Sequence, residues 1–572
     1  MDFDRWSQRL RTGLFWVVLL GLVILQSAGL PIPFAGGFHD DGVYLVTAKA
    51  LAEGRGYSIE SLPQPLAQTK YPIVFPAFLA AVWKLNPNFP ANLFCLRMVP
   101  LTATWLWMGA IWWLTAKELG RPRLAAWLVL LTIASPAVTY LALQPLSEGL
   151  FSLLVTLALI LLVRLRRSER IESLEVVAAA LLISLAYHTR TIGIALFPAG
   201  IVVLVRKRRW SCLVVYAAVF LAAAAPWWIW QAIHPIPGDP ILDYYTKGNY
   251  LSWNPFTGTS TMLPVLPALK NLVWICLAPY FVWQLPPVLF PFALIPLCLP
   301  VVLFIGASRW VKSPAEPIGV FLACYVGITL LWTWPPGRFL IPVVPFLALL
   351  VRSSAAWRRG FRFALIMEGV AAALVVWGSA VTALNMRASA EMQVLQGPFG
   401  RDSASWPDRL QAYHWIKHNT LKGEILAANL DPNLWLYCGR KAVRAFAADP
   451  ISLFYDPRPN ATPLGSSSTL VGRLQHHRVS ILIFEDSDLF GETRHYRRAI
   501  DELLVSCPGL LRRVFVSASG RVEIYRLSQV QNAAETDAAC TCTERNSGLT
   551  MTERARSADS LVGETPPSLM ND

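Results

Sequence analysis

The amino-acid sequence predicts an all-α polytopic membrane bundle with a small α/β extramembrane domain at its C-terminal end. Of the 572 residues, 55% are hydrophobic and only 15% are charged, whereas about a quarter of the residues in a soluble domain are charged. Residues 1–385 alternate apolar runs with short basic loops. The 23 tryptophans and 42 prolines fit the aromatic belts of membrane proteins and the tolerance of membrane helices for proline.

About eleven stretches approach the length of about 20 largely apolar residues that a membrane-spanning helix needs. We expect spans at 13–31, 95–116, 123–141, 147–163, 174–188, 191–205, 211–232, 285–307, 317–334, 337–351 and 363–384. The first resembles a signal peptide but lacks a small-residue cleavage site, so we expect it to be an anchor. Two further apolar stretches, 71–84 and 272–283, are short and bounded by proline, which favours interfacial or re-entrant helices.

The distribution of basic residues predicts the orientation of these spans. The net charge of +14 is spread over short clusters between apolar runs, so we do not expect nucleic acid as a partner. If the N-terminus is cytoplasmic, these clusters all fall on the cytoplasmic side, as the positive-inside rule requires. They lie at Arg121 and Arg123, 164–170, 206–209, Arg309 and Lys312, and 352–362. We therefore expect a multi-pass protein of the inner (plasma) membrane, with loops 32–94 and 233–271 and everything after 385 outside.

The composition changes after the last predicted span. Residues 386–528 are expected to form an extracytoplasmic α/β domain, with a helix at 407–419 and strands at 425–428, 480–484, 511–516 and 522–526. The polar tail, 529–572, has the composition of a disordered segment. Cys438 and Cys507 can pair if this domain is exported, but their spacing alone does not decide this.

Two adjacent carboxylates open the first outside loop, in His39-Asp40-Asp41-Gly42. A helix N-cap explains one of them, at about 1 kcal/mol. A second carboxylate at a membrane exit is costly if it is partly buried, and a catalytic base or a metal ligand would account for it. The residues alone leave both interpretations open, and a divalent metal stays compatible with them.

Several cations lie at membrane boundaries on the predicted outer face, where the charge rule disfavours them. Taken alone, Lys70 fits a snorkelling or headgroup-facing lysine somewhat better than a phosphate ligand. Arg190 and Arg338 either pair with acidic residues or bind an anionic lipid phosphate. Glu148 lies on the same face, and its position also suits the first turn of a helix. No Walker loop, GxSxG, HExxH or dinucleotide-binding motif is present, so nucleotide coupling and soluble-hydrolase mechanisms have no support.

These residues, taken in order along 1–385, resemble the membrane glycosyltransferases of the C-type fold (GT-C). The resemblance is to the group of protein O-mannosyltransferases and aminoarabinose transferases. It is carried by Asp40-Asp41-Gly42-Val43-Tyr44 followed by Ala48, by Lys70-Tyr71-Pro72 with Phe75-Pro76, by Ser147-Glu148, by Arg190-Thr191-Ile192-Gly193, and by Arg338-Phe339-Leu340-Ile341-Pro342 with Pro345. Thr69 stands where aminoarabinose-transferring members have an acidic residue, which counts against that sugar and against a metal site using that acid.

The resemblance implies an inverting transferase whose donor is a sugar on a polyprenyl phosphate, such as dolichyl or undecaprenyl phosphate. Asp40 would be the general base and Asp41 would orient the base or the acceptor. Lys70, Arg190 and Arg338 would bind the donor phosphate. The residues that would contact the acceptor or support this set are His39, Tyr44, Tyr71 and Glu148. The acceptor would be a glycan, a lipid or a protein.

Two other classes of protein compete with this interpretation. A transporter or flippase for an anionic lipid or sugar would carry ionisable residues at mid-membrane depth and internal repeats, and neither is evident. A non-enzymatic envelope assembly protein would tolerate loss of Asp40.

Overall fold

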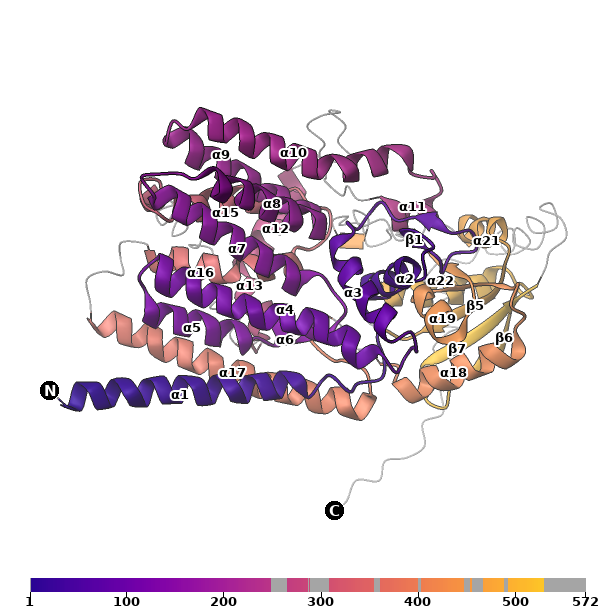
Figure 1. The fold of residues 1–572 in the computed structure, drawn as a ribbon. Helices are drawn as coiled ribbons and strands as arrows, with labels where there is room; N and C mark the ends of the chain where they lie inside the picture. The colour runs from indigo at the N-terminus through magenta and orange to yellow at the C-terminus, as the bar shows by residue number, and fades with distance from the viewer. Residues whose placement is uncertain are drawn as a thin grey trace, which may run out of the picture.

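The computed structural model is a long helical bundle with a mixed α/β domain at one end (Figure 1). It describes residues 2–247, 265–286, 288, 308–353, 361–399, 403–446, 453–454, 467–487 and 492–528. The predicted span at 285–307 therefore lies almost entirely outside the described residues, and the tail 529–572 lies entirely outside them.

The helices of the bundle follow the predicted apolar stretches closely. Its first half contains α1 (Asp2–Ser27), α4 (Leu93–Trp113) with the π-turn η1 (Leu114–Glu118), α5 (Pro122–Ile133), α6 (Pro136–Leu143), α7 (Glu148–Arg167), α8 (Ser173–Thr189), η2 (Thr191–Leu196), α9 (Phe197–Arg206) and α10 (Trp210–Ile233). Its second half contains α12 (Val265–Cys276), α13 (Ala278–Trp283), α15 (Glu316–Leu330), η4 (Gly337–Val343), α16 (Val344–Ser353) and α17 (Phe361–Met392).

The predicted count of eleven spans is not confirmed. Among the described residues, four helices are long and apolar enough to cross a membrane, namely Leu93–Glu118, Glu148–Arg167, Trp210–Ile233 and Ile366–Met392, and the bent pair α5–α6 makes up to five. The other predicted spans in this part of the chain correspond to shorter apolar helical stretches, of which Thr12–Ser27 is the apolar part of α1. Hydropathy detects apolar runs, but it does not detect every break inside them.

Two of these breaks have clear local causes. α5 and α6 meet at an angle of 62° because Pro136 opens α6, and a proline disfavours helical geometry in the residue before it. Arg190 is extended, with φ −150° and ψ 128°, which ends α8, and the chain continues as the 3-10 turn η2 before α9 begins.

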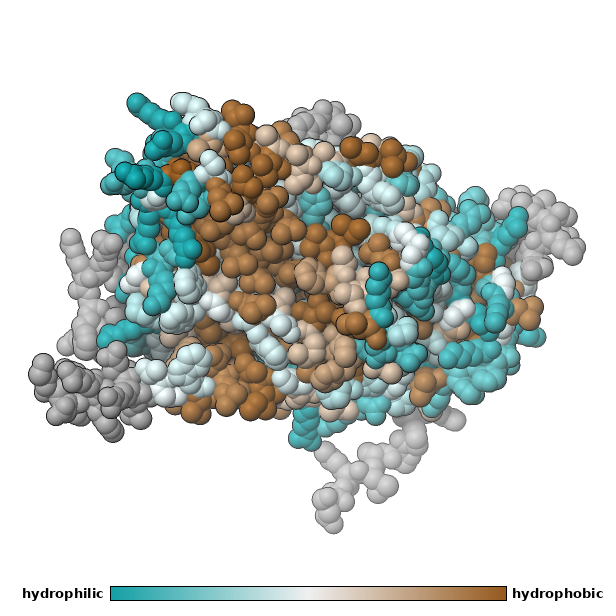
Figure 2. Space-filling view, viewed as in Figure 1, coloured by the Kyte–Doolittle hydropathy of each residue, from teal (hydrophilic) through white to brown (hydrophobic). Residues whose placement is uncertain are grey.

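An apolar band crosses the middle of the bundle and is flanked by hydrophilic surface at both ends (Figure 2). On α10, the strongly apolar side chains of Val214, Leu221 and Ile229 are all at least half exposed. A lipid-facing surface explains such a band, because lipid leaves no reason to bury these side chains.

The first predicted outside loop is compactly folded beside the α/β domain (Figure 1). It contains α2 (Asp40–Ala52), the short antiparallel pair β1 (Ser58–Ile59) and β2 (Leu66–Ala67), and α3 (Val74–Leu85). α3 covers the predicted interfacial stretch 71–84, and α11 (Pro240–Thr246) belongs to the second long loop.

The C-terminal region forms a five-stranded sheet in the order β4-β3-β5-β7-β6. β3 (Ile425–Ala428) pairs in parallel with β4 (Ala442–Arg444) and β5 (Val479–Glu485), whereas β7 (Val522–Leu527) pairs antiparallel with β5 and β6 (Leu511–Val516). Its helices are α18 (Trp406–Asn419), α19 (Asp431–Cys438), α21 (Ser467–His476) and α22 (Glu492–Ser506). The four predicted strands and the predicted helix at 407–419 are present.

The cysteines of this region do not pair as the sequence allowed. Cys438 is a free, buried thiol, whereas Cys507 is disulfide-bonded. The two are therefore not partners. Cys438 lies at the end of α19 and packs in the core.

Candidate active site

Asp40 is the first residue of α2, where the loop after α1 turns into a helix. Its carboxylate accepts a hydrogen bond from the Tyr71 hydroxyl and forms an ion pair with the Arg338 guanidinium. Only 7% of Asp40 is exposed. Burial alone would raise the pKa of this carboxyl, but the charges of Arg338 and Lys70 outweigh it and hold the pKa well below its usual range. Asp40 is therefore ionised at neutral pH.

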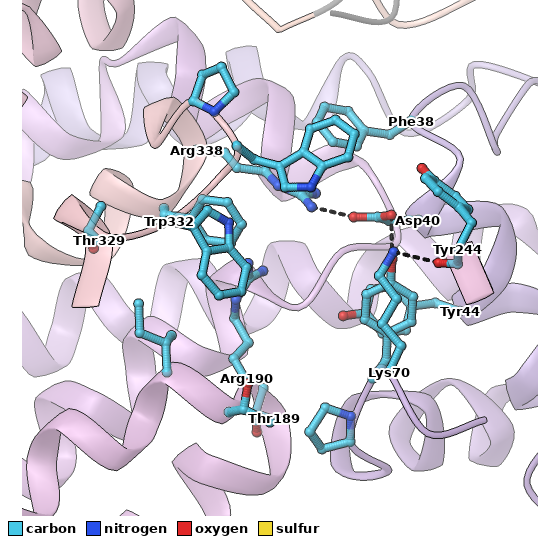
Figure 3. Close-up of a pocket in the computed structure, with 17 residues that line it drawn as sticks. Phe38, Asp40, Tyr44, Lys70, Thr189, Arg190, Tyr244, Thr329, Trp332 and Arg338 are labelled. Atoms are coloured by element: carbon cyan, nitrogen blue, oxygen red, sulfur yellow. Dashed lines mark hydrogen bonds and ion pairs between the residues drawn. The ribbon is translucent and has the colours of Figure 1, made fainter. Parts of the chain in front are cut away.

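Lys70 approaches the same carboxylate from the segment before α3 (Figure 3). Its ammonium donates a hydrogen bond to the Tyr244 carbonyl at 3.1 Å and lies 4.4 Å from the centre of the Tyr244 ring and 5.0 Å from that of Tyr71. An aromatic surround of this kind holds a cation in place by its ring quadrupole.

Glu148 holds the two arginines together. Its Oε1 lies 2.6 Å from Arg190 Nη1 and 3.7 Å from Arg338 Nη1. Arg190 also donates to the Ser147 hydroxyl at 3.2 Å, and that hydroxyl is 3.1 Å from the Tyr44 hydroxyl. The ion pairs thus connect the start of α7, the α8–η2 hairpin and η4 across more than 180 residues of sequence.

These groups surround one cavity. Figure 3 shows Arg338 and Lys70 reaching toward Asp40, with Arg190 and Trp332 across the space. The lining residues are Phe38, Asp40, Tyr44, Lys70, Tyr71, Pro72, Thr189, Arg190, Thr191, Ile192, Tyr244, Thr329, Trp332, Trp334, Pro335, Arg338 and Phe339. Three cations and one carboxylate line it, and Glu148 lies just behind. The cluster of these five therefore carries a charge of +1, which favours an anion.

The structure separates two of the predicted site residues from this cavity. Asp41 is completely buried and accepts hydrogen bonds from the backbone N–H groups of Gly36, at 2.7 Å, and Phe38, at 3.0 Å. Burial raises its pKa to about 6 despite these hydrogen bonds. His39 points to Asp431 in the C-terminal domain, with Nε2 3.0 Å from Oδ1. Neither side chain lines the cavity.

The remaining predicted residues lie at the cavity or directly behind it. Tyr44 and Tyr71 line it, next to Lys70, Arg190 and Arg338. Arg97, another cation on the predicted outer face, instead donates to backbone carbonyls of the loop before α2, those of Leu30, Ile32 and Phe34. Its role is to hold that loop rather than to face the cavity.

Sequence reasoning missed the aromatic side of the cavity. Phe38, Tyr244, Trp332, Trp334 and Phe339 all line it. The run Trp332-Thr333-Trp334-Pro335 directly before Arg338 was the available indication, because aromatic rings beside a cation at a membrane boundary fit a ligand that is partly apolar and partly charged.

The described residues offer no evident metal site. No group of three or more His, Cys, Asp or Glu side chains in this part of the chain could hold a metal ion.

Thr69 donates a hydrogen bond to the Thr246 carbonyl at 3.0 Å, so this position fastens the second loop to the first.

The structure thus combines a helical bundle, a carboxylate at the start of α2 and a cavity lined by three cations with a mixed α/β domain near the end of the chain. Neither a protein-family model nor a curated protein sequence matches the chain.

Among solved structures, ArnT from Cupriavidus metallidurans bound to undecaprenyl phosphate is similar over 90% of this chain and 98% of its own, with a TM-score of 0.55 and 15% identity. The apo state of the same protein gives a TM-score of 0.53 at the same coverage and identity. The archaeal oligosaccharyltransferase AglB from Archaeoglobus fulgidus, in complex with an inhibitory peptide and a dolichol-phosphate, is similar over 91% of this chain and 75% of its own, with a TM-score of 0.51 and 12% identity. The chain therefore has the GT-C fold.

Proposed function

We propose that this protein transfers a sugar from a polyprenyl-phosphate donor to an acceptor at the extracytoplasmic face of the membrane, with inversion at the anomeric carbon. The observation that carries the proposal is the arrangement of Lys70, Arg190 and Arg338 around one cavity that also contains the Asp40 carboxylate. The cations suit a lipid phosphate, and the carboxylate suits a proton acceptor. Two solved structures of this fold hold undecaprenyl phosphate and dolichol-phosphate.

In the proposed reaction, the acceptor hydroxyl attacks the anomeric carbon while Asp40 takes its proton. The bond from the anomeric carbon to the phosphate oxygen breaks, and the polyprenyl phosphate leaves with the bonding electrons. Lys70, Arg190 and Arg338 stabilise the negative charge that develops on it. One fixed hydrogen-bond-donating or cationic group of this kind contributes about 10²- to 10³-fold in rate. A positioned base contributes about 10²- to 10⁴-fold.

Donor binding would also activate the base. Before the donor arrives, Arg338 forms an ion pair with Asp40, which makes that carboxylate a weak base. A donor phosphate bound by Arg338 and Lys70 would compete for the same cations. Asp40 would then lose part of its stabilisation as an anion, and its affinity for a proton would rise in the complex where it is needed.

The test is sugar transfer by the purified protein in detergent or liposomes, with a radiolabelled sugar on undecaprenyl phosphate. Asp40→Asn should lower kcat by about 10²- to 10⁴-fold, because the amide is nearly isosteric but cannot accept the proton. The control is Asp408→Asn, which changes a capping carboxylate of α18 away from the cavity. Full activity of Asp40→Asn would contradict Asp40 as the general base. Transfer from a nucleotide sugar without lipid would contradict a polyprenyl-phosphate donor.

The orientation is tested separately. Arg170 is an exposed residue of the loop between α7 and α8, which the proposal places on the cytoplasmic side. A cysteine at this position should react with a membrane-impermeant maleimide only after the cells are opened. Labelling in intact cells, above the background of the parent protein, would contradict the proposed orientation.

A further inference from the structure

A buried polar junction lies behind Asp40, on the side away from the cavity. His39, the residue before Asp40, is 1% exposed and its Nε2 is 3.0 Å from Oδ1 of Asp431, which is completely buried. Asp431 is the first residue of α19 in the C-terminal domain. The residue next to the proposed base is thus hydrogen-bonded to a residue 392 positions away.

The same junction reaches the second loop and Lys70. The backbone N–H of Arg444, in β4, donates to the Tyr245 hydroxyl at 2.8 Å, and the Arg444 guanidinium lies 4.2 Å from the centre of the Tyr244 ring. Tyr244 in turn accepts the hydrogen bond of Lys70. The C-terminal domain therefore contacts His39, which precedes Asp40, and Tyr244, which binds Lys70.

The backbone at this junction is held in an unusual conformation. His39 has φ +61° and ψ −54°, although it carries a side chain, and such a conformation costs about 1–3 kcal/mol unless its surroundings stabilise it. Gly36 has φ +92°, and a Cβ at this position would lie 1.8 Å from Asn433 Oδ1. The turn before Asp40 therefore fits closely against α19.

Three residues of α19 hold this turn, and we call Asp431, Asn433 and Tyr437 the α19 clamp. Asn433 Nδ2 donates to the Gly36 carbonyl at 3.3 Å. The Ala35 N–H donates to the Tyr437 hydroxyl at 3.0 Å. Together with the pair of Asp431 and His39, these contacts fix the chain from residue 35 to residue 39, immediately before the carboxylate.

We infer that the α19 clamp makes the C-terminal domain part of the active site, with Asp431 and His39 as positioning residues for Asp40. This inference rests on the proposed function. If the pair of Asp431 and His39 is lost, the His39 side chain loses the hydrogen bond that holds it to α19. The strained backbone at His39 can then relax, and Asp40, the next residue, moves with it. A displacement of about 1 Å at a reacting group can cost about 10²-fold in rate.

The alternative is that Asp431 only satisfies a buried histidine and contributes to folding. The two roles differ in what they predict for catalysis by the folded protein. Asp431→Ala removes the acceptor, whereas Asp431→Asn keeps an oxygen that accepts from His39. The matched control is Asp408→Ala, which breaks the capping box of α18 in the same domain without touching the first loop.

With a radiolabelled undecaprenyl-phosphate sugar as the probe, Asp431→Ala should lower kcat by 10- to 100-fold and leave the donor KM within about threefold. Asp431→Asn should retain most of kcat, and His39→Ala combined with Asp431→Ala should be no worse than either alone. Asp408→Ala should leave kcat unchanged. A kcat of Asp431→Ala within twofold of the wild type would overturn the inference.

Hydrogen exchange separates failure of the clamp from failure of the proposed function. The backbone amides of residues 35–41 should exchange faster in Asp431→Ala than in the wild type or in Asp408→Ala, whatever the reaction is. If the wild type transfers no sugar from any lipid-linked donor, the proposed function fails. Unchanged exchange in Asp431→Ala contradicts the clamp even then.

Discussion

The two ends of α7 have the same kind of ion cluster in different surroundings. In each cluster one glutamate lies between two arginines, and both glutamates are buried, with exposed fractions of 2% for Glu148 and 3% for Glu316. α7 has 20 residues, so the clusters lie roughly 30 Å apart. A buried charge needs a partner in both places, so ion pairing alone does not distinguish a binding site from a structural contact.

The Glu316 cluster is closed. Its Oε2 lies 2.8 Å from Arg166 Nε and its Oε1 lies 2.6 Å from Arg206 Nε, so each carboxylate oxygen has its own arginine. None of the three residues lines the cavity. This cluster joins the end of α7 to α9 and α15, and we expect it to contribute to stability only.

The Glu148 cluster is open. One oxygen, Oε1, serves both Arg190 and Arg338, whereas Oε2 has no hydrogen-bond partner in the described part of the chain. Both arginines line the cavity, where Lys70 adds a third positive charge. An excess of cations facing a cavity, rather than the presence of buried ion pairs, therefore indicates an anion site.

Arg338→Gln should give the largest effect on the open cluster. It removes the charge that contacts both Asp40 and Glu148, and we expect kcat/KM for transfer to fall by about 10²- to 10³-fold. The assay is initial-rate transfer from the lipid-linked donor. A loss below threefold would mean that the open cluster is no more functional than the closed one.

The matched change Glu→Gln at the two clusters should affect different properties. Glu316→Gln leaves two partly exposed arginines without a counter-charge, so we expect a loss of about 1–3 kcal/mol in stability and a change in kcat below twofold. Glu148→Gln should lower kcat/KM at least about tenfold, because Arg190 and Arg338 lose their common anchor. Thermal unfolding in detergent and transfer assays would be compared, and equal effects of both variants on transfer would contradict the distinction.

The pH dependence gives a smaller effect. In the wild type the pKa of Asp40 lies well below its usual range, so kcat/KM should show no acid limb from Asp40 down to pH 5. Without Arg338, burial raises the pKa of this carboxyl. Asp40 then binds a proton as the pH falls toward 5, and kcat/KM of Arg338→Gln should fall several-fold between pH 7.5 and 5.5. If the pH profiles of kcat/KM were parallel in the wild type and Arg338→Gln, the ion pair with Arg338 would not be the cause of the low pKa of Asp40.

The sequence predicts much of this site because its charged residues lie near the ends of apolar stretches. Asp40, Lys70, Arg190 and Arg338 are recognisable as charges at membrane boundaries, and the strands of the C-terminal region are recognisable as short β-type runs. Distances between these charges depend on helix packing, which hydropathy does not describe. His39, predicted to contact the acceptor or to support the site, illustrates the limit, because the sequence does not reveal that its partner is Asp431, 392 positions away.

The helix count has a related limit. Apolar composition does not reveal that Pro136 bends α5 against α6. The break at Arg190, between the predicted stretches 174–188 and 191–205, does interrupt the apolar run, and the backbone there is extended. Arg190 both ends α8 and lines the cavity. Such a break provides backbone geometry that brings a charge into a cavity, where a continuous helix would not.

The most direct test of the open cluster as an anion site is the affinity for undecaprenyl phosphate of two matched variants, Arg190→Gln and Arg166→Gln. Each removes one arginine from one buried glutamate, at the open and at the closed cluster respectively. Binding would be measured by native mass spectrometry or by quenching of tryptophan fluorescence. We predict about a tenfold or greater loss of affinity for Arg190→Gln, since a charge-assisted contact contributes about 1.5–3 kcal/mol, and wild-type affinity for Arg166→Gln. Equal affinities of the two variants would contradict it.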